Sequence, residues 1–140
     1  MNQTIIIGEK HPFYCTGSQK EKTERTFTIE YECFLIAKYK PDTIFLEGSN
    51  PITRQRAIKK ILSKIDINPQ IVSFTFKKDY LNVPNNRVDV VYEEDLIEQL
   101  EDVIKTNQKS IAFIGIYHLK RAREKLRRNE NFDIHCLDIS

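Results

Sequence analysis

Short apolar runs alternate along this chain with longer segments in which apolar residues recur every three or four positions. The short runs are rich in Ile, Val and Phe, a composition typical of strands that are buried on both faces. Six strands are predicted in this way, over residues 4–8, 43–46, 70–76, 88–92, 110–116 and 132–139.

The segments between these runs have helical spacing. Thr23 is a predicted N-cap for a helix that ends near residues 40–42, and Asn50-Pro51 marks the start of the next one. The clearest amphipathic pattern lies between residues 96 and 104, and a basic helix is expected over 119–128. Strands that alternate with helices favour a mostly parallel sheet.

We therefore predict an α/β fold of three layers, α/β/α, around a mostly parallel sheet of about five to six strands. Helices should cover both faces of the sheet, because the apolar runs need cover on both sides. Three of the runs should be adjacent central strands: "IIIG" (5–8), "TIFL" (43–46) and "IAFIG" (111–115).

Length and composition narrow the class of protein. A chain of 140 residues suits one domain, 1–140. Charged residues make up 30% and hydrophobic residues 40%, which excludes a disordered or membrane-embedded chain. No apolar run approaches a membrane span, and we expect no signal peptide and no membrane partner. The three cysteines lack Cys-x-x-Cys spacing, which indicates reduced thiols and a cytoplasmic protein.

Polar side chains stand where the predicted strands end. Glu9 and His11 follow the first strand, Glu47 follows the second, and His118 follows the fifth. Gly8 is expected to permit a sharp exit from its strand. Ligands bind beyond the carboxyl ends of open parallel sheets, so we expect these four side chains to converge. Two carboxylates and two imidazoles suit zinc or manganese, and equally suit a metal-free acid–base site.

Two Gly-x-x-His motifs carry a family resemblance. "GEKH" at 8–11 and "GIYH" at 115–118 each end an apolar run, and "PDTIFLEGS" lies between them at 41–49. This order resembles the superfamily that joins the TraB and Tiki proteins, the ChaN-like proteins and the erythromycin esterases. The resemblance covers residues 4–50 and 109–126.

The resemblance implies a hydrolase, either metal-dependent or metal-free, that acts on an ester or peptide bond of a small-molecule or peptide substrate. It implies catalytic residues that could also hold the divalent metal, namely Glu9, His11, Glu47 and His118. Arg25 is a further implied site residue, with Glu30 as its alternative on the same predicted helix. The chain is shorter than most members of the superfamily, so we expect a homodimer that supplies the missing wall of the pocket.

Two other functions stay open. "DTIFLEGSN" at 42–50 also resembles the strand-Glu-Gly start of Toprim nucleases, in which Glu47 would bind magnesium together with Glu93 and Asp95. The expected Asp-x-Asp is Glu-x-Asp here, and Glu47 would have to neighbour Glu93 rather than Glu9. The third possibility is a non-catalytic dimeric domain that binds a nucleotide or a partner protein, although no Walker spacing is present.

Other polar features have structural interpretations. Six of the ten residues at 119–128 are Lys or Arg, and the pattern favours a solvated helix face over a nucleic-acid surface, since no aromatic residue interrupts it. His135 lies inside a predicted strand and is interpreted as structural. Cys15 lies near the expected site, but a nucleophilic role would require a partnered base.

Overall fold

Five parallel strands form one sheet in the part of the chain that the structure describes. This computed structural model describes the backbone of residues 1–10, 19–48 and 51–139, and the side chains of 1–10, 28–48 and 52–139. The strands are β1 (Asn2–Glu9), β2 (Thr43–Leu46), β3 (Gln70–Ser73), β4 (Lys109–Gly115) and β5 (Phe132–Ile139). Their order is β3-β2-β4-β1-β5, and every neighbouring pair is parallel. The prediction that three apolar runs are adjacent central strands is confirmed, since β2, β4 and β1 occupy the centre.

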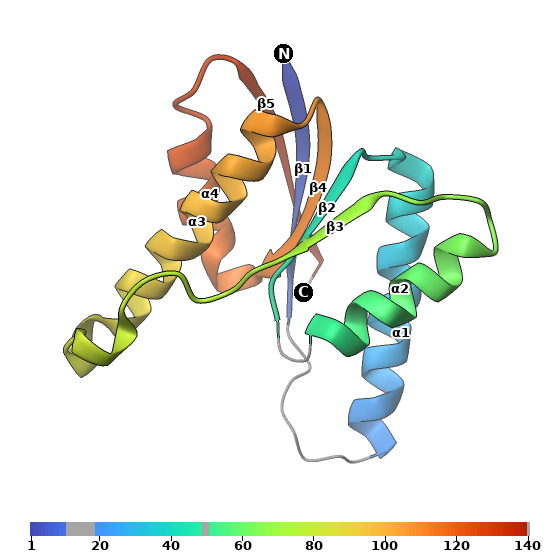
Figure 1. Ribbon diagram of the computed structural model, residues 1–140, viewed down its shortest axis with the longest axis horizontal. Coiled ribbons are helices and arrows are strands. Elements are labelled where there is room, and N and C mark those ends of the chain that lie inside the picture. The colour runs from blue at the N-terminus through green and yellow to red at the C-terminus, as the bar shows by residue number, and fades with distance from the viewer. Residues whose placement is uncertain (11–18, 49–50, 140) are drawn as a thin grey trace.

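Helices cover both faces of this sheet, as Figure 1 shows. The helices are α1 (Gln19–Tyr39), α2 (Pro51–Ser63), α3 (Val88–Thr106) and α4 (Ile116–Leu126), and two short 3-10 turns precede α3, η1 (Tyr80–Asn82) and η2 (Asn85–Arg87). Helices α1 and α2 pack on one face, and α3 and α4 pack on the other. The predicted three-layer α/β/α fold is therefore confirmed. No helix in the described ranges has both the length and the apolar character that a membrane crossing requires.

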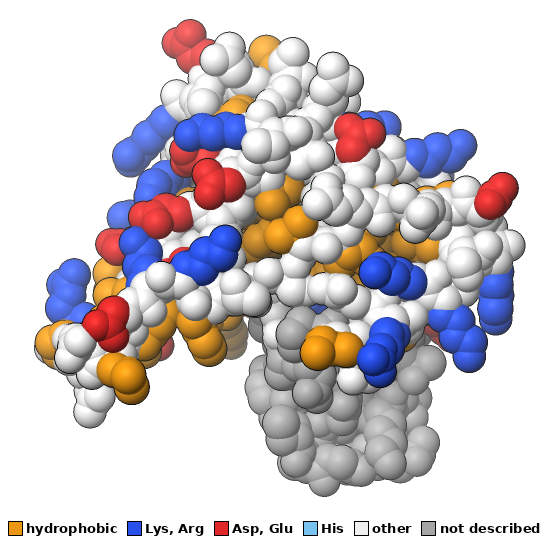
Figure 2. Space-filling model, viewed as in Figure 1, with side chains coloured by type: hydrophobic (Ala, Val, Ile, Leu, Met, Phe, Trp, Pro, Cys, Tyr) orange, Lys and Arg blue, Asp and Glu red, His pale blue; other side chains and the backbone are white. Residues whose placement is uncertain are grey.

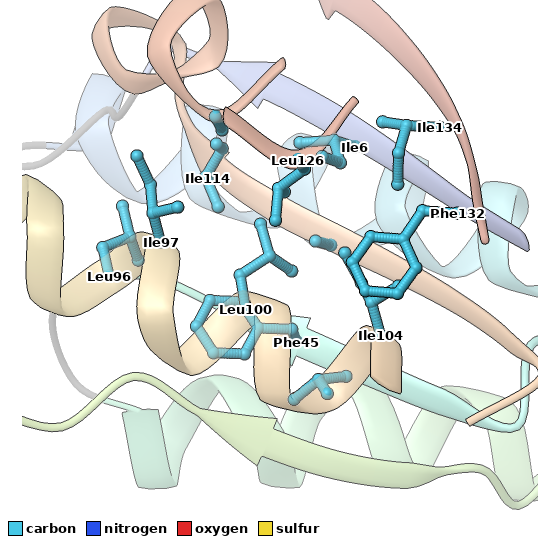
Figure 3. Close-up of a cluster of buried hydrophobic side chains, with 13 residues drawn as sticks. Ile6, Phe45, Leu96, Ile97, Leu100, Ile104, Ile114, Leu126, Phe132 and Ile134 are labelled. Carbon is cyan, nitrogen blue, oxygen red and sulfur yellow. The ribbon is translucent and has the colours of Figure 1, made fainter. Parts of the chain in front are cut away.

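The hydrophobic core is divided by the sheet into two clusters. Successive side chains of a strand point to opposite faces, so Ile6 and Phe45 join Leu100 in the cluster beneath α3 and α4 (Figure 3). Ile7 and Ile44 belong to the cluster beneath α1 and α2. This alternation also determines the face to which polar residues at the strand ends point.

The predicted strand at residues 88–92 is wrong, because these residues form the first turns of α3. Tyr92 lies four positions before Leu96, which lies four before Leu100, so the apolar stripe of the helix extends back through the short β-branched run. The helix begins at Val88, directly after η2. A short apolar run cannot by itself distinguish a buried strand from a buried helix.

Gly8 has a different role from the one expected. Strand β1 continues through Gly8, which pairs with Ile114 of β4 and Asp138 of β5. A Cβ atom at this position would lie 2.9 Å from Cδ2 of Leu119 on α4. The glycine therefore permits the first turn of α4 to approach the sheet closely and does not mark a sharp exit.

Candidate functional site

The carboxyl ends of β1, β4 and β2 lie at a point where the chain connections diverge. Strands β1 and β2 lead into α1 and α2 on one face, whereas β4 leads into α4 on the other face. In open α/β sheets, ligands bind at such a switch point. Three residues stand there at the strand ends: Glu9 ends β1, Gly115 ends β4, and Glu47 directly follows β2.

The pleat of the sheet separates the two carboxylates that the sequence predicts to converge. Glu9 lies two residues after Ile7 and points with it toward α1 and α2, where it contacts Arg54 of α2. Glu47 lies two residues after Phe45 and points with it toward α3 and α4. The strand ends therefore carry two polar clusters, one on each face, rather than one pocket that contains both carboxylates.

Glu47 is the buried centre of the cluster on the α3 and α4 face. Its side chain is only 4% exposed. The backbone N–H of Gly115 donates to its Oε1 over 2.7 Å, and the hydroxyl of Tyr92 donates to its Oε2. A buried carboxylate needs such donors to replace its hydration. Gly115 is the N-cap of α4, so the helix dipole also favours negative charge at this position.

His118 lies between two carboxylates in this cluster. Its Nδ1 atom is 2.9 Å from Oε2 of Glu93, and its Nε2 atom is 3.6 Å from Oε2 of Glu47. The first distance is a hydrogen bond, and the second is too long for one. Since an ionised carboxylate only accepts, Glu93 favours the tautomer in which Nδ1 carries the proton. The basic lone pair then lies on Nε2, which faces Glu47 in a side chain that is 21% exposed.

Tyr92 connects the two parts of the cluster. Its ring lies beside the imidazole of His118, with centroids 5.5 Å apart, while its hydroxyl binds Glu47. Burial raises the pKa of Tyr92, and the hydrogen bond to Glu47 raises it further. The hydroxyl therefore stays protonated and acts as a donor that holds the Glu47 carboxylate in place.

Asp95, one of the residues of the nuclease alternative, has a structural role in the described chain. Its Oδ2 accepts hydrogen bonds from the backbone N–H of Lys77 at 3.0 Å and the hydroxyl of Tyr80 at 2.8 Å, and its Oδ1 accepts one from Gln99 at 2.8 Å. Burial acts to raise its pKa, but these hydrogen bonds hold the pKa below its ordinary value. Asp95 and Glu93 both lie on α3 rather than at the end of a strand. Of the two, Glu93 is the one that contacts His118.

Arg54 organises the cluster on the opposite face. Its Nε and Nη2 atoms bind the carboxylate of Glu32, which is fully buried on α1. Nη2 also donates to Oε1 of Glu9 over 2.9 Å, and Nη1 donates to the backbone carbonyl of Glu47 over 2.6 Å. Gly48 has φ +148°, and a Cβ atom there would lie 2.8 Å from Nη1. Arg54 thus connects α1, β1 and the end of β2.

The pKa of Glu9 is raised above its ordinary value. Burial raises its pKa from 4.5 to about 9, the neighbouring carboxylate of Glu32 raises it as well, and Arg54 opposes both effects. Its Oε2 atom is buried and has no hydrogen-bond partner among the described residues. Two ionised carboxyl groups beside one guanidinium would leave an excess negative charge, and a proton on Glu9 would remove it.

Replacing Glu9 by glutamine should flatten the dependence of stability on pH. Between about pH 4.5 and about pH 9 the folded chain keeps a proton that the unfolded chain has released. The contribution of that proton to the free energy of unfolding is fully present below about pH 4.5. It is lost as the pH rises toward about 9, by at most about 1.4 kcal/mol per pH unit. Glu9→Gln carries no such proton. Urea unfolding at pH 5, 7 and 9 should therefore show the variant gaining stability relative to the wild type as pH rises, whereas parallel profiles would contradict a protonated Glu9.

Three of the residues considered for the site lie wholly or partly outside the described part of the chain. His11 lies outside the described residues, as does Cys15, and the side chain of Arg25 is also outside them although its backbone lies in α1. Glu30 is exposed on α1, and His135 is exposed on β5, where it pairs with Asp133.

Arg54, Glu32 and Tyr92 are site residues that the sequence interpretation missed. Arg54 and Glu32 each interrupt an otherwise apolar helical stripe, whereas Tyr92 continues the stripe of α3. Arg54 lies four positions before Ile58, and Glu32 lies four positions before Ile36. A charged residue on the buried side of a helix needs a partner of opposite charge or a hydrogen-bond partner. The positions of Arg54 and Glu32 in their helical stripes could therefore have identified them as site residues.

Two of the four residues that were expected to bind a metal lie close together. Glu47 and His118 face each other, but Glu9 is engaged by Arg54 on the other face. Within residues 1–10, 28–48 and 52–139, no three His, Cys, Asp or Glu side chains are arranged to hold a metal ion. A zinc centre takes at least three protein ligands, so the described side chains do not complete one.

Comparisons of this chain with known proteins give no family assignment. No protein-family model, curated protein or solved structure matched it. The resemblance to the TraB, Tiki and erythromycin esterase superfamily therefore stays a prediction from the two Gly-x-x-His motifs and the glutamate between them.

Proposed function

We propose that this chain is a hydrolase of an ester or peptide bond in which His118 activates a water molecule. The observation that carries this proposal is the position of His118, with Glu93 on Nδ1 at 2.9 Å and Glu47 facing Nε2 at 3.6 Å. A carboxylate that orients a partly exposed histidine is the arrangement used by general bases. His118 also lies at the switch point of the parallel sheet, and parallel sheets of this kind bind their ligands at the switch point.

The reaction would proceed by transfer of one proton to and from Nε2. A water oxygen attacks the carbonyl carbon while Nε2 takes one of its protons, which gives a tetrahedral oxyanion and an imidazolium. Glu93 and Glu47 stabilise the imidazolium because both are carboxylates close to the ring. The intermediate then collapses, the bond to the leaving oxygen or nitrogen breaks, and Nε2 returns the proton to that atom.

The partner and compartment predictions rest on the sequence. The substrate class, a small molecule or peptide, follows from the proposed hydrolase. The homodimer and the cytoplasmic setting both stay predictions from the sequence.

The tautomer of His118 tests the proposal independently of any substrate. With the imidazole neutral, 15N NMR should show the Nδ1–H tautomer at His118, because Glu93 accepts that proton. Glu93→Leu should shift the ring toward the Nε2–H tautomer and lower the hydrolysis of a panel of ester and peptide substrates by roughly tenfold or more. Since a leucine cannot accept a hydrogen bond, both effects have the same cause.

Glu94 provides the matched control for this experiment. It is the next residue on α3 and is exposed. Glu94→Leu makes the same chemical change one position away from His118, so it should leave the tautomer and the rates unchanged. A wild-type His118 in the Nε2–H form, or a Glu93→Leu variant with the full wild-type rate, would contradict the proposed role of His118.

A further inference from the structure

A group of aromatic rings lies beside the proposed general base. The ring centroid of Tyr92 is 5.5 Å from that of His118, 4.9 Å from that of Phe74 and 6.0 Å from that of Phe76. Phe76 also contacts Phe74 at 5.7 Å and Tyr80 at 5.0 Å, each in an edge-to-face geometry. These residues, which we name the aromatic wall, connect His118 to the surface through Tyr92.

Phe76 is exposed although its position is fixed. Its side chain is 70% exposed, yet the three rings of Phe74, Tyr80 and Tyr92 contact it. An aromatic ring held in this way loses little conformational freedom when a ligand packs against it.

The backbone on both sides of Phe76 is also held. The side chain of Gln99 donates to the carbonyl of Thr75 over 2.6 Å and accepts from its N–H at 3.3 Å. The N–H of Lys77 donates to Asp95 over 3.0 Å. Both anchors belong to α3, so the loop that carries Phe76 is fastened to the helix that carries Tyr92 and Glu93.

Two polar side chains beside the aromatic wall are already paired. The hydroxyl of Tyr80 donates to Asp95, and Lys78 forms an ion pair with Glu98 at 3.1 Å. Figure 2 shows hydrophobic side chains along the lower edge of the arm that leads from β3 to the start of α3. This surface therefore offers the faces and edges of its rings to a ligand.

We propose that the substrate hydrolysed at His118 carries an aromatic group that packs against Phe76. This inference rests on the proposed hydrolase and names its substrate class. An aromatic ligand gains from ring contacts with an edge-to-face or offset geometry, beyond the gain from burying apolar area. A saturated ring of the same size gains only from burial, so the aromatic wall should distinguish the two.

The test measures binding of two matched amide probes by saturation-transfer NMR. N-phenylacetamide carries an aromatic ring, and N-cyclohexylacetamide carries a saturated ring of similar size. The wild type should bind the phenyl probe more tightly than the cyclohexyl probe. Phe76→Ala should weaken binding of the phenyl probe roughly five- to tenfold. Because Phe76 is largely exposed, this variant should fold normally.

Leu81 supplies the control, since it is 97% exposed and belongs to the same arm. Leu81→Ala removes an exposed apolar side chain without touching the aromatic wall and should leave both affinities unchanged. Equal binding of the two probes to the wild type, no binding of the phenyl probe, or an unchanged affinity in Phe76→Ala would each overturn the inference. Selective phenyl binding in a protein that hydrolyses nothing would instead refute the hydrolase and retain the aromatic site.

Discussion

Replacing His118 by alanine should lower kcat/KM for hydrolysis by about 10² to 10⁴, the range that a positioned general base contributes. The variant keeps Glu47 and Glu93 but loses the imidazole, whose Nε2 takes a proton from water and returns it to the leaving group in the proposed reaction. Since His118 is partly exposed and contacts Glu93, Glu47 and the ring of Tyr92 near the surface, its loss should leave the fold intact. Rates on a panel of ester and peptide substrates, together with circular dichroism, test both statements.

His135 is the matched control for this variant. It is 68% exposed on β5 and pairs with Asp133 away from the strand ends. His135→Ala should hydrolyse every substrate at the wild-type rate. The double variant His118→Ala/Glu93→Leu should be no slower than His118→Ala alone, because residues that act as one unit fail together. Full activity in His118→Ala would refute the proposed site.

The fold could be predicted because its central strands are buried on both faces. β1, β2 and β4 are continuous apolar runs, and such runs occur in parallel sheets that have helices on both sides. The run at residues 88–92 was misassigned because four or five apolar residues fit a strand and the first turn of a helix equally well. Only the continuation of its stripe to Leu96 and Leu100 distinguishes the two.

The site could be predicted only in part. A residue at the end of a predicted strand is known to lie at that edge of the sheet, but the sequence does not show to which face of the sheet its side chain points. Glu9 and Glu47 were expected together, but Glu9 falls on the face of Ile7 and Glu47 on the face of Phe45. Deciding this from the sequence requires the register of β1 and β2 against β4, which is set by tertiary packing. Glu47 and His118 lie close together, because Glu47 falls on the face of the sheet on which α4 carries His118.

The partners of the two carboxylates are long-range features that no local pattern specifies. Arg54 is 45 residues from Glu9, and Tyr92 is 45 residues from Glu47. Their spacing along the chain has no motif, and the helices that carry them are placed by the hydrophobic core. The sequence does show that Arg54 interrupts an apolar stripe and that Tyr92 continues one, but not which partner each side chain meets.

Replacing Arg54 by methionine should destabilise the protein by about 3–5 kcal/mol, the range for removing one partner of a buried ion pair. Methionine keeps most of the volume and removes the guanidinium. The carboxylate of Glu32, which has no exposed surface, would then be buried without a counter-charge, and the carbonyl of Glu47 would lose its donor. Urea unfolding monitored by circular dichroism gives the free energy of unfolding.

Arg56, two residues later on α2 and exposed, is the control, and Arg56→Met should change stability by no more than about 0.5 kcal/mol. Arg54→Lys should recover little, because one ammonium cannot reach Glu32, Glu9 and the Glu47 carbonyl with a planar fork. The double variant Arg54→Met/Glu32→Leu should recover much of the loss, since it removes the uncompensated charge together with its partner. If Arg54→Met alone lost less than about 1 kcal/mol, the buried pair with Glu32 would not contribute as described. If the double variant were less stable than the single one, the loss would come from packing rather than charge.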